Sequence, residues 1–184
     1  TYPEIAIVES WNGSSWTEVA DLNAVRENTG SAGSQTAAIL FGGNPRPASG
    51  AAVEFWDGSS WTEVGDLANP GLGRVGAGAS NTAALAMGGY VSSNFANVEE
   101  WNFESTLTAG AWASGGDLNA GRTNAGSSVQ GSNTATIVFG GYNPGTTAGV
   151  VLNELYNGTS WTEVADLNNA RWSMSGFGIS TSAV

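Results

Sequence analysis

Arginine recurs along this sequence at a nearly constant interval, and charged side chains at a fixed spacing are the first candidates for chemistry. Four of the five arginines stand 48, 48 and 49 residues apart, and these are Arg26, Arg74, Arg122 and Arg171. A symmetric set of guanidinium groups could bind an anion. However, the five N–H donors of arginine also suit it for bridging backbone carbonyls and a carboxylate. We expect this second, structural role, with a repeated glutamate as the partner.

The acidic residues do not single out a catalytic pair. A glycosidase needs two carboxylates at a set distance, whereas the recurring acids occur once per repeat and therefore belong to its construction. These acids are Glu9, Glu54, Glu99, Glu154, Asp21, Asp66, Asp117 and Asp166. Glu100 and Glu104 break the symmetry, and we expect both to be solvated. The sequence predicts no catalytic residue and no enzyme, and a glycoside hydrolase is an alternative.

Composition excludes several classes of site. The 184 residues include no His, Cys or Lys, so the usual zinc sites, a Ser-His-Asp triad, a thiol nucleophile and a Schiff-base lysine are ruled out. The net charge of −11 opposes binding to nucleic acid or to an anionic membrane. No apolar stretch is long enough for a membrane helix. We expect no cofactor and no metal site, although an axial calcium ion held by backbone carbonyls would leave no mark in a sequence.

Internal repeats cover most of the chain. One phrase recurs as VESWNGSSWTEVADL at 8–22, VEFWDGSSWTEVGDL at 53–67 and NELYNGTSWTEVADL at 153–167. A second, apolar phrase ends in Gly42-Gly43, Gly88-Gly89 and Gly140-Gly141. A period near 48 with several short apolar segments is typical of propeller blades, and the Asn-Gly and Asp-Gly pairs favour hairpin turns. The sequence therefore predicts an all-β protein with four short strands in each repeat.

Counting the repeats predicts a single domain, 1–184, that forms a four-bladed β-propeller. Three complete blades span 26–73, 74–121 and 122–170, and a fourth is composed of 171–184 and 1–25. We expect these N- and C-terminal half-blades to pair, because that pairing closes the ring and removes the free strand edges. The narrow axis requires small side chains on the first strand of each blade. Segment 173–180 is bulkier, and we expect it to plug the centre.

Aromatic pairs recur in the hairpins that contain the first phrase. Their second members, in the fourth strand of each blade, are Trp16, Trp61, Trp112 and Trp161. We expect each pair to fill the wedge between two neighbouring blades. An aromatic side chain buries about 150–250 Å², so these pairs are expected to supply much of the apolar core.

These motifs resemble the kelch repeat, in which Arg opens the first strand, Gly-Gly ends the second, and aromatic residues mark the third and fourth. Arg74, Gly88-Gly89, Trp101 and Trp112 match in that order, and the repeats that begin at Arg26 and Arg122 match in the same way. The wording is similar to kelch-like arrays of marine bacteriophages and their hosts, where such repeats are usually assigned to virion appendages or surface proteins. Most kelch proteins have more than four blades, so a fragment of a larger array is an alternative.

The resemblance and the composition together imply a non-enzymatic structural or binding module, extracellular or on a virion. Its partners would be other virion or surface proteins, with no nucleic acid and no membrane insertion. A lectin-like propeller is the alternative function, with Tyr90 and Tyr142 stacking on sugars, because both directly follow Gly-Gly at the start of a variable loop. The oligomeric state stays open. Adjacent chain ends would close the ring within a monomer, and separated ends would complete the fourth blade between copies.

Overall fold

The structure, a computed structural model, describes residues 5–45, 50–103, 111–143 and 148–183. Within these ranges the regular secondary structure consists of β-strands without helices, and every strand pair is antiparallel. The all-β expectation is therefore confirmed. The same ranges contain no helix long and apolar enough to cross a membrane.

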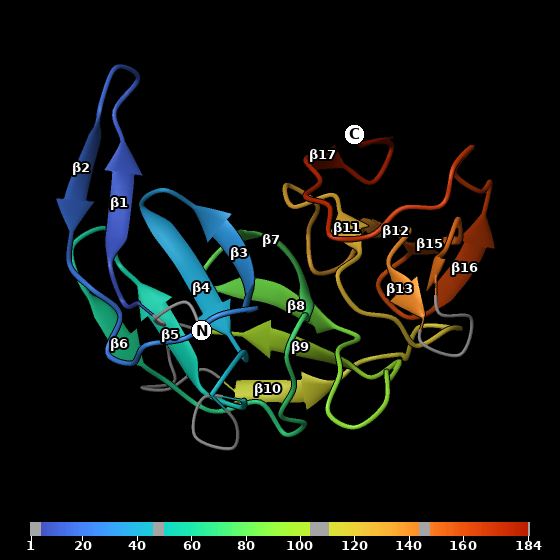
Figure 1. The fold of residues 1–184 in the computed structure, drawn as a ribbon, viewed down its shortest axis with the longest axis horizontal. Coiled ribbons are helices and arrows are strands. Elements are labelled where there is room, and N and C mark those ends of the chain that lie inside the picture. Colours follow the sequence, from blue (N-terminus) through green and yellow to red (C-terminus); the bar gives the residue numbers. More distant parts are fainter. Residues whose placement is uncertain (1–4, 46–49, 104–110, 144–147, 184) are drawn as a thin grey trace.

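Three four-stranded sheets form the body of the molecule (Figure 1). The first sheet contains β3 (Gly30–Ser34), β4 (Ala37–Phe41), β5 (Val53–Trp56) and β6 (Trp61–Glu63). The second sheet contains β7 (Val75–Ser80), β8 (Ala83–Met87), β9 (Val98–Asn102) and β10 (Ala111–Ser114). The third sheet contains β11 (Gly126–Ser127), β12 (Thr136–Phe139), β15 (Asn153–Tyr156) and β16 (Trp161–Val164). In each sheet the strands pair in chain order, so each of the three longer repeats is an antiparallel meander.

The turns of the repeated hairpins explain why their sequence is so constant. In the β5–β6 turn the Asp57 carboxylate accepts hydrogen bonds from the backbone N–H groups of Ser59, at 2.8 Å, and Ser60, at 2.9 Å. Gly58 follows with a φ of +96°, a conformation that favours glycine. In the two Asn-Gly hairpins the side chains of Asn12 and Asn157 accept the equivalent pair of backbone hydrogen bonds. Local turn chemistry therefore fixes the register of these hairpins.

The three remaining sheets have two strands each. They pair β1 (Val8–Trp11) with β2 (Trp16–Val19), β13 (Tyr142–Asn143) with β14 (Ala148–Gly149), and β17 (Gly178–Ile179) with β18 (Ser182–Ala183). In the described residues β1 pairs only with β2 and β17 only with β18. The expected pairing of the terminal half-blades within the chain is therefore not found. Among the described residues no middle strand pairs with β1.

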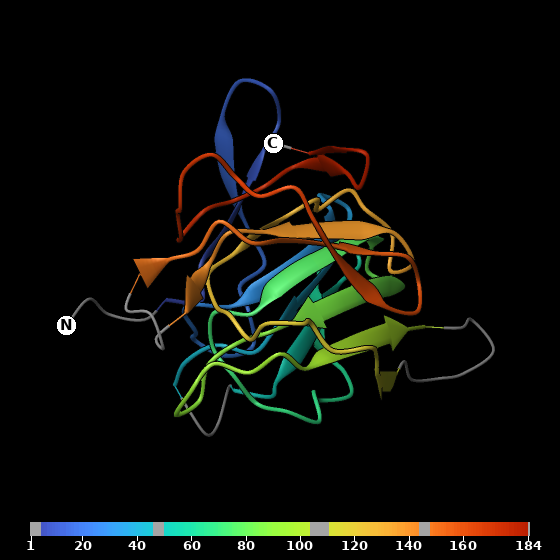
Figure 2. The same cartoon turned by 90° about the vertical axis from the view of Figure 1, so that its right-hand side faces the viewer.

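The sheets follow one another along an arc. Figure 1 places the β1–β2 hairpin beyond the first sheet and the C-terminal segment near the third, and Figure 2 views the arc from the side of the third sheet. One buried apolar cluster contains residues of the first and second sheets, and another contains residues of the second and third. The hydrophobic core therefore lies between sheets.

The first strands of neighbouring sheets approach closely, because their side chains are small. A Cβ added to Gly76 on β7 would overlap the backbone carbonyl of Ser31 on β3. On the other side, the Ser127 hydroxyl of β11 donates to the carbonyl oxygen of Gly76 at 2.5 Å. Met174, Ser175 and Gly176 line a space together with residues of these first strands, whereas Phe177 is 61% exposed and Ile179 is 50% exposed. Only the first part of the expected plug, 173–180, therefore lies at the centre.

Candidate functional site

Three of the four repeated arginines are buried and form ion pairs with a glutamate in the third strand of their own sheet. Arg26 binds Glu54, Arg122 binds Glu154, and Arg74 lies 2.9 Å from Glu99. The guanidinium groups also donate to backbone carbonyls, which include those of Ala52, Ala86 and Leu152. Because these terminal N–H groups bind acceptors inside the sheets and the three side chains are buried, these three arginines do not form an open anion site.

Each buried glutamate also binds the segment that leads into its sheet. Glu154 accepts the backbone N–H and the side-chain amide of Asn119, at 2.7 and 2.8 Å. Glu54 accepts the same two groups of Asn23, both at 2.8 Å. In the second sheet the backbone N–H of Ala68 donates to Glu99 at 2.7 Å. The carboxylate therefore joins consecutive repeats and also neutralises the arginine.

Arg74 reaches this arrangement from a different backbone position. In the later repeats the second glycine of Gly-Gly donates its N–H to the carbonyl oxygen of Arg122 or Arg171, at 3.1 and 3.0 Å. In the first repeat the equivalent bond ends on Gly71, at 3.0 Å, three residues before Arg74. The Arg74 side chain therefore makes the same kind of ion pair as Arg122, although its backbone lies three residues further along the repeat.

Burial determines the electrostatics of these arginines. Desolvation lowers the pKa of Arg74, although the nearby Glu99 opposes the shift. Desolvation likewise lowers the pKa of Arg122 to about 10, and the negative charge of Glu163 opposes it. Buried charges persist only when they are paired, so these ion pairs are integral to the fold.

Arg171 and Glu9 have the same place in the repeat but a different environment. Both side chains are exposed, and within the described ranges neither belongs to an ion pair. Asn168, which corresponds to Asn119, is exposed as well. The charged cluster that is complete in three places is therefore open in the fourth.

The aromatic pairs of the second and third sheets fill the spaces between sheets. Trp101, which is fully buried, packs on apolar residues of the first sheet, namely Ile39, Phe41, Val53 and, on the connection after β6, Leu67. Tyr156 and Trp161 pack in the same way on the second sheet and its connection, on Leu85, Met87, Val98 and Leu118. Thus each pair occupies the face of the preceding sheet.

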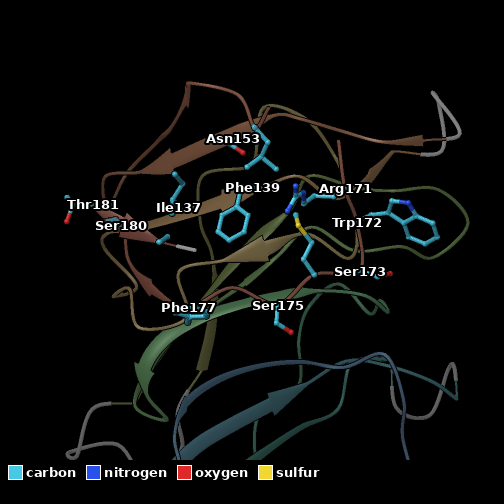
Figure 3. A pocket seen from close by; sticks show the side chains of 13 residues that line it. Ile137, Phe139, Asn153, Arg171, Trp172, Ser173, Ser175, Phe177, Ser180 and Thr181 are labelled. Atoms are coloured by element: carbon cyan, nitrogen blue, oxygen red, sulfur yellow. The ribbon is translucent and has the colours of Figure 1, made fainter. Parts of the chain in front are cut away.

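The corresponding face of the third sheet opens into a pocket of about 870 Å³, which we call the third-sheet pocket. Its walls include Ile137, Phe139, Asn153 and Leu167. In the first and second sheets, the residues at the corresponding positions are those on which the aromatic pair of the next sheet packs. Arg171, Trp172 and Met174 also line it. Figure 3 shows Phe139 and Arg171 among the side chains that converge there. Sequence reasoning missed this pocket, because it treated the ring as closed.

The aromatic pair of the first hairpin is the one left exposed. The rings of Trp11 and Trp16 lie 5.5 Å apart between centroids, close to the 5.2 Å of Trp56 and Trp61. Trp11 is nevertheless 43% exposed and Trp16 is 64% exposed. The hairpin therefore carries the side chains of an inter-sheet pair without a sheet to cover them.

Tyr90 and Tyr142 lie where their loops begin, and both are half-buried. Tyr90 exchanges backbone hydrogen bonds with Leu72, at 3.0 and 3.1 Å. The ring of Tyr142 lies 5.5 Å from that of Trp172, which is 54% exposed. The structure thus joins Tyr142 to Trp172 and not to Tyr90, and this pair, of which Trp172 is the exposed member, is a candidate surface for stacking on a ligand.

Of the two acids that break the repeat symmetry, the structure describes Glu100. Glu100 accepts a hydrogen bond from the Tyr156 hydroxyl at 2.5 Å. Burial, the hydrogen bond and the Glu100 charge together raise the pKa of Tyr156 to about 12. Glu104 lies outside the described residues. No group of three or more His, Cys, Asp or Glu suited to a metal ion occurs within the described ranges.

Comparisons with known proteins support the fold only. No family model matches this sequence, and neither does any curated protein. A solved structure described as "Structure of YjhT" superimposes with a TM-score of 0.67 over 96% of this chain and 70% of that one, at 14% sequence identity. At that identity the likeness is one of fold alone.

Proposed function

We propose that the chain is a non-enzymatic structural or binding module of the kelch-like propeller type, presented on a virion or other extracellular surface, where it contacts other proteins. In this proposal its three longer repeats are propeller blades, and 171–184 and 1–25 are two half-blades that do not pair with each other within the described residues. The observation that carries the proposal is that three of the four repeated arginines are bound in ion pairs inside the fold. The guanidinium of Arg122 is bound to Glu154 and to backbone carbonyls, so it serves the scaffold.

Turnover measurements test the non-enzymatic part of this proposal. The protein is incubated with a panel of glycosides, since paired carboxylates are the remaining acid–base chemistry. We expect no hydrolysis. Hydrolysis that a single Glu100→Gln or Glu104→Gln change abolishes would overturn the proposal in favour of a glycoside hydrolase.

A lectin-like function is the second candidate, and the Tyr142–Trp172 pair favours it. Aromatic rings can stack on the apolar faces of sugars, and here the exposed ring of Trp172 lies next to the half-buried ring of Tyr142. Glycan-array binding that Trp172→Ala removes, and that Val91→Ala on a neighbouring exposed loop leaves unchanged, would support it. Without binding across a broad array, the protein-contact function stands.

A further inference from the structure

The first hairpin and the third-sheet pocket correspond, in the repeat, to the two surfaces that pack together between the second and third sheets. Between the second and third sheets, Tyr156 and Trp161 cover apolar residues that include Leu85 and Met87. The corresponding pocket residues are Ile137 and Phe139, and among the residues that the structure describes no aromatic pair from another repeat lines this pocket. Trp11 and Trp16 are that pair in the repeat sequence, and they are exposed.

The hairpin has the same internal geometry as those that already fill an inter-sheet space. In β1–β2, Trp11 lies opposite Trp16 and Glu9 opposite Glu18. In β15–β16 the register is the same, with Tyr156 opposite Trp161 and Glu154 opposite Glu163. A hairpin of this register placed on the third-sheet face would therefore present Trp11, Trp16 and Glu9 together.

The charges of the two surfaces are complementary as well. Arg171 is exposed at the edge of the third-sheet pocket, and Asn168 is exposed three residues before it. Their counterparts, Arg122 and Asn119, bind Glu154. Glu9 has the position of Glu154 in its hairpin and lacks an ion-pair partner in the described ranges.

Within one chain the hairpin is held at the other end of the arc. The side-chain amide of Gln35 in the first sheet donates to Ser10 Oγ and to the Trp11 carbonyl oxygen, at 2.6 and 2.7 Å. Asn23, which follows the hairpin, is bound to Glu54 of the same sheet. Figure 1 shows the hairpin beside the first sheet and apart from the third. These anchors keep Trp11 and Trp16 away from the pocket of their own chain.

We propose that the β1–β2 hairpin of one molecule inserts into the third-sheet pocket of a second copy of this chain, with Trp11 and Trp16 covering Phe139 and with Glu9 bound by Arg171 and Asn168. The proposal rests on the proposed propeller-type function, because it treats the hairpin as half of a blade. The contact is head-to-tail, so reciprocal insertion closes a dimer, and other geometries form larger rings or chains.

Charge exchange between copies tests this contact. Light scattering should give the wild-type protein a mass of two or more copies of the 18.7-kDa chain. Glu9→Arg alone and Arg171→Glu alone should each weaken association by about 30-fold or more, since each places two like charges against each other in the contact. Mixing the two variants should restore association. Glu27→Arg, which makes the same charge change at another exposed glutamate, should associate as the wild type does.

Cross-linking gives a second measurement that does not depend on the affinity. The chain contains no cysteine, so a Glu9→Cys copy mixed with an Arg171→Cys copy can form only introduced disulfides. We expect an oxidised species of twice the chain mass from this mixture and none from Glu27→Cys mixed with Arg171→Cys. A monomeric wild type, or no rescue on mixing, would overturn the proposal. Either result leaves the glycoside and glycan measurements unaffected, so its failure is separate from that of the proposed function.

Discussion

Asn119 and Glu154 belong to consecutive repeats, and two hydrogen bonds join them. The backbone N–H and the side-chain amide of Asn119 both donate to one carboxylate oxygen of Glu154, while the other oxygen binds Arg122. The same carboxylate therefore ties the incoming chain to the new sheet and balances a buried positive charge. The free energy of folding of each repeat thus depends on a group contributed by the preceding connection.

Removing the charge of Glu154 should destabilise the fold strongly. In Glu154→Gln the buried guanidinium of Arg122 loses its counter-charge, a loss that costs about 3–5 kcal/mol. Asp66→Asn, at an exposed position, is the matched control and should change the free energy of unfolding by less than about 0.5 kcal/mol. Urea unfolding followed by tryptophan fluorescence measures both. Equal stabilities of the two variants would contradict a structural role for the ion pair.

The contact between inner strands predicts an effect of a single methyl group. Gly76→Ala places a Cβ against the Ser31 carbonyl, and this overlap is with backbone, so the two strands must separate. Overpacking of this kind costs about 1–3 kcal/mol. Ala79→Ser, on an exposed position of the same strand, should stay within about 0.5 kcal/mol of the wild type. Thermal unfolding compares them, and an unchanged midpoint for Gly76→Ala would contradict close approach of β3 and β7.

The Asp57 turn predicts a stability change at acid pH. Hydrogen bonds from the Ser59 hydroxyl, and then from the Ser60 and Ser59 N–H groups, lower the pKa of Asp57 from 3.8 to about 2. A lowered folded-state pKa stabilises the fold above pH 3.8, and this stabilisation is lost as the pH falls through about 2. Asp57→Asn should keep the neutral-pH stability, because Asn157 makes the same backbone bonds, and it should lose less stability between pH 4 and 2. Identical acid profiles would contradict this.

The sequence was sufficient to predict the repeat unit and insufficient to predict how the ends meet. Turn residues such as Asp57-Gly58 act locally, so the all-β class and the hairpins follow from short motifs. Whether β1 meets β18 depends on contacts between residues far apart in the chain, and no local motif reports these. The expected closure within one chain was inferred from counting repeats, and it treated the first hairpin as equivalent to those that have a middle strand beside them.

The candidate site was predictable only where the repeat is complete. The structural role expected for Arg26, Arg74 and Arg122 follows from arginine chemistry, and their partners recur in the same period. The three-residue backbone offset of Arg74 was hidden, because a long side chain can reach one carboxylate from different positions. The third-sheet pocket was also hidden, because no sequence motif marks it. It exists because the aromatic pair that would pack on Phe139 lies elsewhere in the fold.

The hydrogen bond between Tyr156 and Glu100 predicts a loss of stability at alkaline pH. Burial first, and then Glu100, raises the pKa of Tyr156 from 10.0 to about 12. The folded protein keeps this proton between those values while the unfolded chain releases it, so the stabilisation is full below pH 10 and is lost as the pH rises through about 12. Tyr156→Phe lacks the titrating group, so its free energy of unfolding should fall less than that of the wild type between pH 10 and 12. Urea unfolding of both proteins at pH 8, 10 and 11 measures this. Parallel curves for Tyr156→Phe and the wild type would contradict a raised pKa of Tyr156 in the folded protein.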